Sequence, residues 1–257
     1  MSDRLRELWG QGGTALGGWL FLREPLVAEA AALSGYDYVC VDMQHGLMDY
    51  GHVVTMLYAM ARTETTPIVR VPWNEPAMIG RVLDAGAYGV IIPMVNTADQ
   101  ARAAVAACRY APLGSRSMGP VGVSARAGRE GYFADANARV LCIPMIETRE
   151  AVENIDEILA VPGIDAVYIG PADLSITYGL EPRTDQDDPG WNAALARVHD
   201  ACVRHGVVPG IHADAGLAGR RHAAGFRMIT VGFDLGSVMT GMRADLSRSR
   251  KDTAPAS

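Results

Sequence analysis

Two carboxylates, Glu147 and Asp173, are spaced so that together they could hold a divalent cation. Each ends an apolar run, LCIPMI before Glu147 and AVYIGPA before Asp173. If these runs are parallel strands joined by the intervening helix, both acids emerge at the same rim of the sheet. Such oxygen ligands suit Mg²⁺ or Mn²⁺, with water and substrate completing the coordination. Alternatively, each acid could simply cap or begin a helix.

Other side chains with catalytic chemistry lie where further apolar runs end. Asp42 and His45 follow the run YVCV. An Asp that orients a His makes a general base near neutral pH, although a solvated loop His is the simpler interpretation. Arg70 follows the run PIV, and a buried Arg could pair with a rim acid or stabilise negative charge on a substrate oxygen. His212 follows VVPGI and is a weaker candidate.

The tetrapeptide Gly170-Pro171-Ala172-Asp173 turns sharply into a helical start. Free backbone N–H groups there would favour an anion such as a substrate carboxylate. The composition of this segment is equally consistent with an ordinary tight turn.

The basic residues exclude imine chemistry. Of 23 Lys and Arg residues, 22 are Arg, and the single lysine, Lys251, lies in a polar C-terminal segment. A Schiff base requires a buried lysine, so a metal ion would have to polarise a substrate carbonyl instead.

Composition narrows the class of protein. With 257 residues, 49% of them hydrophobic, the chain has the size of a single eight-unit α/β barrel. No apolar stretch reaches the ~20 residues of a membrane span, and the N-terminus lacks a signal-peptide core. The net charge of −6 with scattered basic residues disfavours nucleic acid. Four widely spaced cysteines without a CxxC motif predict reduced thiols and a cytoplasmic location.

Eight apolar runs alternate with helical patterns, which predicts a (β/α)8 TIM barrel over residues 1–247 and a flexible tail over 248–257. An open doubly wound sheet lacks support, because no GxGxxG follows the first run. The segment 148–160 is predicted as one helix, and the last helix as 235–246. Residues 110–135 show no clear period, so we predict a long functional or partner-covered loop. The predicted strands are 17–22, 38–43, 67–71, 89–94, 141–147, 166–173, 207–211 and 227–232.

These segments resemble the HpcH/HpaI family of class II, metal-dependent 2-keto acid aldolases. The resemblance extends from about Gly17 to Gly241. The matching segments are VDMQHG (41–46), VRVPWN (69–74), LDAG (83–86), PMV (93–95), MIETRE (145–150) and IGPADLS (169–175).

The resemblance implies a barrel whose eighth helix is exchanged with a neighbour, in a hexamer built as a trimer of dimers. It implies that Glu147 and Asp173 bind Mg²⁺ or Mn²⁺ and that Arg70 stabilises an enolate. His45 with Asp42 would move the proton, and Asp84 would reach the aldehyde in a neighbouring subunit's site. The residues implied in substrate binding are Arg70, Gly170, Pro171, Ala172, Asp173, Gln44 and Trp19.

Two positions depart from the family pattern. Gln44 stands where many members have Glu, and Met145 where some have Gln. Both bear on the choice of donor and aldehyde, and Gln44 could suit hydroxypyruvate.

The expected function is therefore a metal-dependent aldolase, which makes or cleaves 4-hydroxy-2-keto acids through a metal-stabilised enolate. Its substrates would be pyruvate or hydroxypyruvate and an aldehyde. One alternative is a CoA-thioester lyase of the malyl- or citryl-CoA type, for which Arg116, Arg126 and Arg129 are the only candidates to bind the nucleotide phosphate. The other is a non-catalytic barrel that binds a keto acid.

Overall fold

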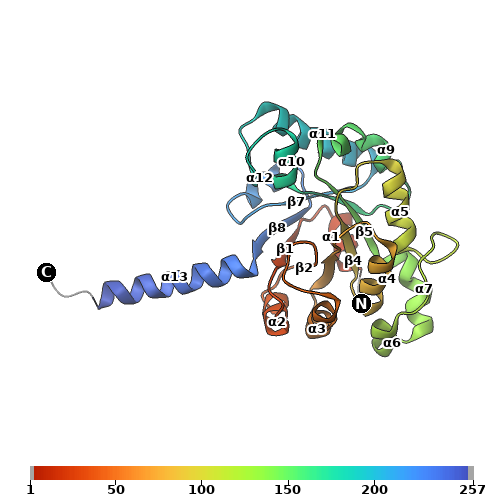
Figure 1. The fold of residues 1–257 in the computed structure, drawn as a ribbon, viewed down its shortest axis with the longest axis horizontal. Helices are drawn as coiled ribbons and strands as arrows, with labels where there is room; N and C mark the ends of the chain where they lie inside the picture. The colour runs from red at the N-terminus through yellow and green to blue at the C-terminus, as the bar shows by residue number, and fades with distance from the viewer. Residues whose placement is uncertain (1–2, 254–257) are drawn as a thin grey trace.

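The computed structural model describes residues 3–253, which form a closed barrel of eight parallel strands (Figure 1). Each strand pairs with the next one in sequence, and β8 closes onto β1. The predicted TIM barrel is thus confirmed, with strand ends close to the predicted positions. The strands are β1 (Ala15–Leu20), β2 (Tyr38–Asp42), β3 (Thr66–Arg70), β4 (Gly89–Ile92), β5 (Leu141–Ile146), β6 (Ala166–Ile169), β7 (Val208–His212) and β8 (Met228–Phe233).

Helices surround the barrel, and several begin with a proline in the first turn, where its missing N–H costs no hydrogen bond. The helices are α1 (Arg4–Gly10), α2 (Pro25–Leu33), α3 (Tyr50–Met60), α4 (Pro76–Ala85), α5 (Ala98–Cys108), α6 (Val121–Ala127), α7 (Arg129–Arg139), α8 (Arg149–Glu153), α9 (Ile155–Leu159), α10 (Pro171–Thr177), α11 (Pro189–His205), α12 (Ala218–Ala223) and α13 (Asp234–Asp252).

Alternation along the strands explains which side chains reach the site. One set of residues, including Tyr38, Cys40 and Ile68, packs inside the barrel, while the other set packs under the helices. Because successive strand residues face opposite sides, Asp42 and Arg70 continue the inward set of β2 and β3. Because all eight strands are parallel, the residues that follow their carboxyl ends lie at the same end of the barrel.

Two segments differ from the sequence-based expectation. The single helix predicted over 148–160 is interrupted at Asn154, whose side-chain amide donates a hydrogen bond of 2.9 Å to the Asn96 carbonyl. The loop predicted over 110–135 contains α6 and the start of α7. On α7 only Ala136 is buried among the described side chains, so the sequence carries no strong apolar period there.

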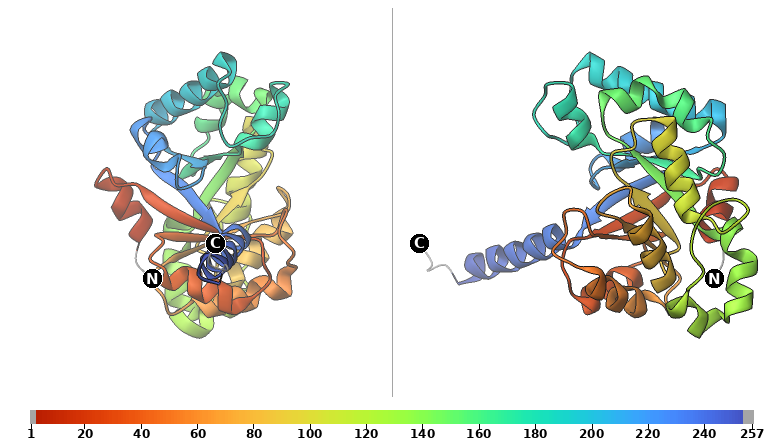
Figure 2. Two further views of the ribbon diagram at one scale, coloured as in Figure 1. Left: turned by 90° about the vertical axis from the view of Figure 1, so that its left-hand side faces the viewer. Right: turned by 45° about the vertical axis from the view of Figure 1, so that its right-hand side comes forward.

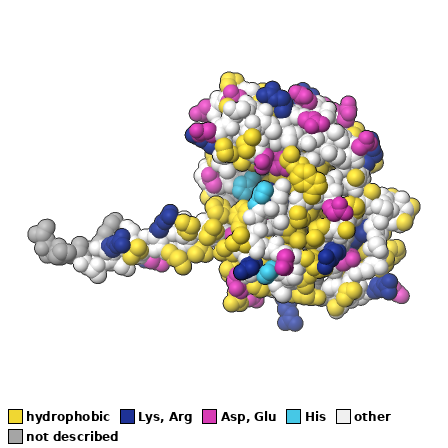
Figure 3. All heavy atoms as spheres, in the orientation of Figure 1, with side chains coloured by type: hydrophobic (Ala, Val, Ile, Leu, Met, Phe, Trp, Pro, Cys, Tyr) yellow, Lys and Arg dark blue, Asp and Glu magenta, His cyan; other side chains and the backbone are white. Residues whose placement is uncertain are grey.

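The last helix leaves the barrel instead of packing on it (Figures 1 and 2). It continues through Asp252, so the predicted end at Leu246 and a tail beginning at residue 248 were wrong, while 254–257 lie outside the described residues. Apolar side chains remain exposed along it (Figure 3). They are Leu235, Val238, Met239, Met242 and Leu246.

Cys40, Cys108, Cys142 and Cys202 are buried free thiols, as predicted. No helix within residues 3–253 is both long and apolar enough to cross a membrane.

Candidate active site

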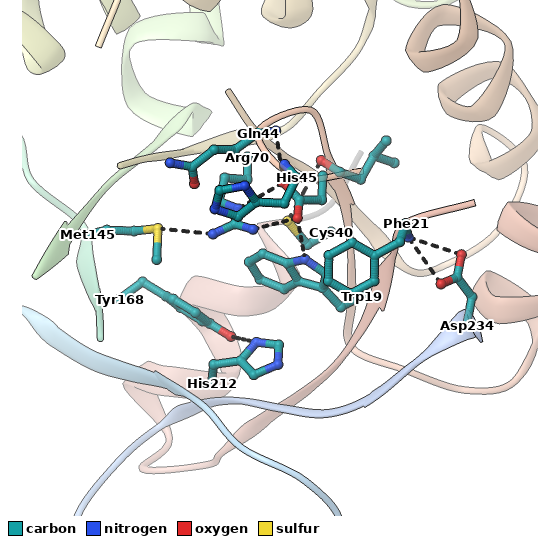
Figure 4. A network of polar contacts seen from close by, with 12 residues as sticks. Trp19, Phe21, Cys40, Gln44, His45, Arg70, Met145, Tyr168, His212 and Asp234 are labelled. Atoms are coloured by element: carbon teal, nitrogen blue, oxygen red, sulfur yellow. Dashed lines mark hydrogen bonds and ion pairs between the residues drawn. The ribbon is translucent and has the colours of Figure 1, made fainter. Parts of the chain in front are cut away.

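A cavity of about 160 Å³ opens at the carboxyl ends of the strands. A larger hollow of about 360 Å³ lies near the opposite ends of β4 and β5, beside α7, and contains none of the predicted catalytic residues. The smaller cavity is therefore the candidate active site. Its walls include Trp19, His45, Arg70, Met145 and Tyr168, all labelled in Figure 4. Asp173 also lines it.

Arg70 and Asp42 form a buried ion pair at the base of this site. Arg70 donates from Nε to Asp42 Oδ1 at 2.8 Å and from Nη2 to Oδ2 at 2.5 Å. Trp19 Nε1 donates to the same carboxylate at 3.1 Å. Burial alone would raise the pKa of Asp42, but the hydrogen bonds and positive charge of Arg70 hold this pKa below its ordinary value. The carboxylate therefore stays ionised and fixes the orientation of Arg70.

The remaining terminal nitrogen of Arg70 faces Met145 at the wall of the cavity. Its Nη1 lies 4.0 Å from the Met145 sulfur, which is a weak acceptor, and makes no stronger hydrogen bond among the described residues. The guanidinium also lies 5.0 Å from the centre of the Trp19 ring. A buried charged donor with an unused N–H is suited to stabilise a developing oxyanion.

Glu147 lies directly after β5 and is 1% exposed. Its Oε1 accepts a hydrogen bond of 2.7 Å from the Met94 N–H. Met94 is the one described non-glycine residue with positive φ, at 56°. Burial raises the pKa of Glu147 to about 7, and the charge of Asp173 adds to the rise against the effect of the Met94 hydrogen bond.

The other Glu147 oxygen is packed against the backbone that begins α10. A Cβ built on Gly170 would come within 2.5 Å of Glu147 Oε2, so glycine is required for this close approach. This oxygen has no hydrogen-bond donor among the described residues. Burying an ionised carboxylate beside a second acid is unfavourable, and a bound cation would offset this electrostatic cost most directly.

The donor set fits a hard divalent cation that retains other ligands. Within the described part of the chain, no group of three or more His, Cys, Asp or Glu side chains is arranged to hold a metal. Glu147 and Asp173 thus offer carboxylate oxygens only, which suits Mg²⁺ or Mn²⁺ completed by water and substrate. Gly170, Pro171, Ala172 and Asp173 line the cavity together, and no side chain caps the start of α10.

The proposed pairing of Asp42 with the His45 imidazole is not formed. Asp42 Oδ1 instead accepts from the backbone N–H groups of Gln44 at 2.9 Å and His45 at 3.3 Å. The Asp42 carboxylate is already occupied by Arg70 and Trp19, so it cannot orient the His45 ring. His45 is exposed at the cavity wall, and Gln44 Oε1 is buried without a hydrogen-bond partner (Figure 4).

Asp84 does not line the cavity of its own chain. It lies near the end of α4 and accepts a hydrogen bond of 2.7 Å from Arg116 Nη2. Arg116 is itself buried, with its guanidinium 4.6 Å from the centre of the Tyr110 ring. This arrangement removes Arg116 from any open groove that could bind a CoA phosphate. The implied role of Asp84 in a neighbouring site stays a prediction.

Sequence reasoning missed several residues of the cavity wall. Tyr168 was assigned only to a buried strand, and Phe21 and Thr184 were not singled out. For Tyr168 the available signal was its position, because it lies two residues before Gly170 in an inward-facing place on β6. His212, ranked low from sequence, also lines the cavity.

Comparison with known proteins identifies the family of the chain. A family model for HpcH/HpaI aldolase/citrate lyase matches residues 16–241. The chain is 42% identical to a hydroxypyruvate/pyruvate aldolase of Rhizorhabdus wittichii, with 96% of this chain and 99% of the relative covered. It is 40% identical to a 4-hydroxy-2-oxovalerate aldolase of Novosphingobium aromaticivorans, with 95% and 93% covered.

A solved structure supports the same assignment. An HpcH/HpaI aldolase/citrate lyase family protein of Burkholderia cenocepacia is 34% identical and superimposes with a TM-score of 0.89, covering 97% of this chain and 100% of that one. Because sequence and fold agree over nearly the whole chain, the protein belongs to the HpcH/HpaI aldolase/citrate lyase family.

Proposed function

We propose that this protein is a divalent-metal-dependent aldolase. It makes and cleaves 4-hydroxy-2-keto acids from pyruvate or hydroxypyruvate and an aldehyde. The observation that carries the proposal is that Arg70 and Asp173 line one small cavity at the carboxyl ends of the strands, while the buried Glu147 carboxylate packs directly behind Gly170 in the wall of that cavity. The similar aldolases, named for hydroxypyruvate/pyruvate and 4-hydroxy-2-oxovalerate, support a 2-keto acid as the donor substrate.

Glu147 and Asp173 would hold Mg²⁺ or Mn²⁺, which when bound draws electron density from the keto group of the substrate. The start of α10 would bind the substrate carboxylate. Among the described residues, the backbone N–H groups of Ala172 and Asp173 donate no hydrogen bond, and both residues line the cavity. Uncapped N–H groups at a helix start favour an anion.

Arg70 and His45 would carry the chemistry at the substrate. Arg70 Nη1 would donate to the oxygen that becomes negative when the donor loses a proton from C3. His45 would accept that proton and return it to the aldehyde oxygen, because it is the exposed imidazole on the cavity wall. Asp42 would act through Arg70 and Trp19, which it holds in place.

Metal removal tests this proposal. The protein treated with a chelator and then freed of it should lose most of its aldol activity with pyruvate and a small aldehyde, and added Mn²⁺ or Mg²⁺ should restore it. The assay measures the aldol product by chromatography, with circular dichroism to verify that the metal-free protein stays folded. Undiminished turnover by the folded, metal-free protein would refute the metal-dependent mechanism.

We also infer that α13 is exchanged between two subunits. Leu235, Val238, Met239 and Met242 recur at three- and four-residue steps and leave one apolar face of α13 exposed. Next to its origin, a hollow of about 250 Å³ on the outside of β1 and α2 is lined by apolar residues including Leu20 and Val27.

A second copy's α13 would cover this hollow, which supports a dimer. Dimers of this kind could build the hexamer implied by the family resemblance, and such an assembly would be needed for Asp84 to reach a neighbour's site. The observation behind the exchange is therefore the pairing of an exposed helix face with an exposed apolar hollow in one chain.

Placing a charge on that helix face should break the assembly. Met242→Glu is expected to lower the molar mass measured by light scattering toward that of a single chain, because the carboxylate would be buried against apolar side chains. Ala244→Glu, on the opposite face of α13, is the matched control and should keep the mass of the parent protein. If Met242→Glu kept the parent mass, or if Ala244→Glu lowered the mass equally, the result would argue against the exchange.

A further inference from the structure

His212 occupies a particular place in the cavity that the proposed mechanism leaves unused. It ends β7 and lines the cavity together with Trp19 and Tyr168. The edge of its ring meets the Trp19 ring at 5.1 Å between centres. Burial lowers the pKa of His212 to about 4, helped by the nearby Arg70, so the ring is neutral near neutral pH.

A chain of hydroxyl groups inside the barrel contacts one nitrogen of His212, and the direction of its hydrogen bonds indicates which nitrogen carries the proton. Tyr168 donates its hydroxyl hydrogen to Thr230 Oγ1 at 2.5 Å, and Tyr38 also contacts that oxygen at 2.9 Å. The Tyr168 hydroxyl has only one hydrogen. Toward His212 Nδ1, 3.4 Å away, it can therefore only accept (Figure 4).

The remaining nitrogen is consequently an acceptor. With the proton on Nδ1, the Nε2 atom carries a lone pair, and it forms no hydrogen bond with any described residue. Since His212 is only partly buried and its exposed surface belongs to the cavity, this lone pair is available to a bound substrate. A hydroxyl group is the neutral donor that substrates of an aldolase can offer.

We propose that His212 is a specificity-determining residue whose Nε2 accepts a hydrogen bond from an alcohol hydroxyl of the substrate. The inference rests on the proposed aldolase function and deepens it. The hydroxyl belongs either to C3 of hydroxypyruvate or to C2 of a hydroxylated aldehyde, which share this chemistry. His212 thus favours hydroxylated substrates over their deoxy counterparts, because a deoxy substrate would leave the Nε2 acceptor without a hydrogen-bond partner.

Two pairs of substrates that differ only by one hydroxyl test the proposal. The donor arm compares hydroxypyruvate with pyruvate at fixed propionaldehyde, and the acceptor arm compares glycolaldehyde with acetaldehyde at fixed pyruvate. In one arm His212→Leu is expected to lower the ratio of kcat/KM values, hydroxylated over deoxy, by about tenfold. His212→Gln, which retains an amide acceptor, should keep that ratio within about threefold of the parent.

Controls separate this role from a structural one. His205→Leu on α11, outside the cavity, should leave both ratios unchanged. The ¹⁵N NMR spectrum of histidine-labelled enzyme, with the signals of residue 212 identified by their loss in His212→Gln, should show a protonated Nδ1 and an unprotonated Nε2. Ratios in both arms that His212→Leu leaves within about twofold of the parent, or a proton on Nε2, would overturn the proposal. Absence of product from every pair with the parent enzyme would instead refute the aldolase function.

Discussion

Glu147→Gln should lower kcat/KM by at least about a thousandfold while the barrel remains folded. Glutamine has nearly the same shape and can still accept the Met94 hydrogen bond at Oε1. It removes the negative charge that would hold the divalent cation with Asp173. The loss is measured by steady-state kinetics, and metal affinity by calorimetry with Mn²⁺.

The same variant should change how the stability of the metal-free protein depends on pH. The pKa of Glu147 is about 7 in the folded chain, above the ordinary 4.5. Because the pKa of Glu147 is higher in the folded chain than in the unfolded chain, its contribution to the free energy of unfolding is fully present below pH 4.5. This contribution is lost as the pH rises through 7. Glu147→Gln should lack this loss, so its free energy of unfolding should change less between these two pH values.

The control for both measurements is Glu150→Gln, an exposed glutamate on α8. It should retain parent kinetics and the parent dependence of stability on pH. If Glu147→Gln kept more than a tenth of the parent kcat/KM at saturating metal, Glu147 would not be a metal ligand.

Arg70→Lys should reduce kcat by about a hundredfold or more with a smaller change in KM. Lysine keeps the positive charge but cannot bind both Asp42 oxygens and still present an N–H to the substrate. Exchange of the pyruvate methyl hydrogens for deuterium, followed by proton NMR, measures loss of the C3 proton without an aldehyde. That exchange should slow as much as the complete reaction.

A fall in unfolding temperature should accompany the catalytic loss, because Asp42 is fully buried and would lose part of its pairing. Arg81→Lys is the matched control. Arg81 stacks on the Tyr50 ring at 3.8 Å, outside the cavity, and its replacement should not alter deuterium exchange. Parent-like exchange in Arg70→Lys would exclude a direct role for Arg70 in the reaction.

The barrel and most of its working rim could be predicted because buried parallel strands leave a strong sequence signal. Continuous apolar runs mark such strands, and a charged residue at the end of one stands out, as Asp42, Arg70 and Glu147 do. The direction of the chain after a strand carries no comparable signal. The sequence therefore suggested a contact between Asp42 and the His45 ring, where the structure has contacts to backbone N–H groups.

The hydroxyl chain inside the barrel could not be predicted either. Tyr38 and Tyr168 occur within apolar strands, where a tyrosine is indistinguishable from an ordinary core residue. Their partner Thr230 is 192 and 62 residues away in sequence, and only barrel closure brings the three together. For the same reason His212 gained importance only when its neighbours were known.

Met94 links the backbone strain at this end of the barrel to the pKa of Glu147. Outside glycine, left-handed backbone costs roughly 1–2 kcal/mol, and here it directs the N–H that holds Glu147. Glycine at position 94 would relieve that cost but release the N–H from a single direction. Selection for heat resistance would therefore favour glycine at position 94, whereas selection for turnover would favour a residue that keeps this N–H fixed. A screen for thermal tolerance alone would select variants that are more stable but slower.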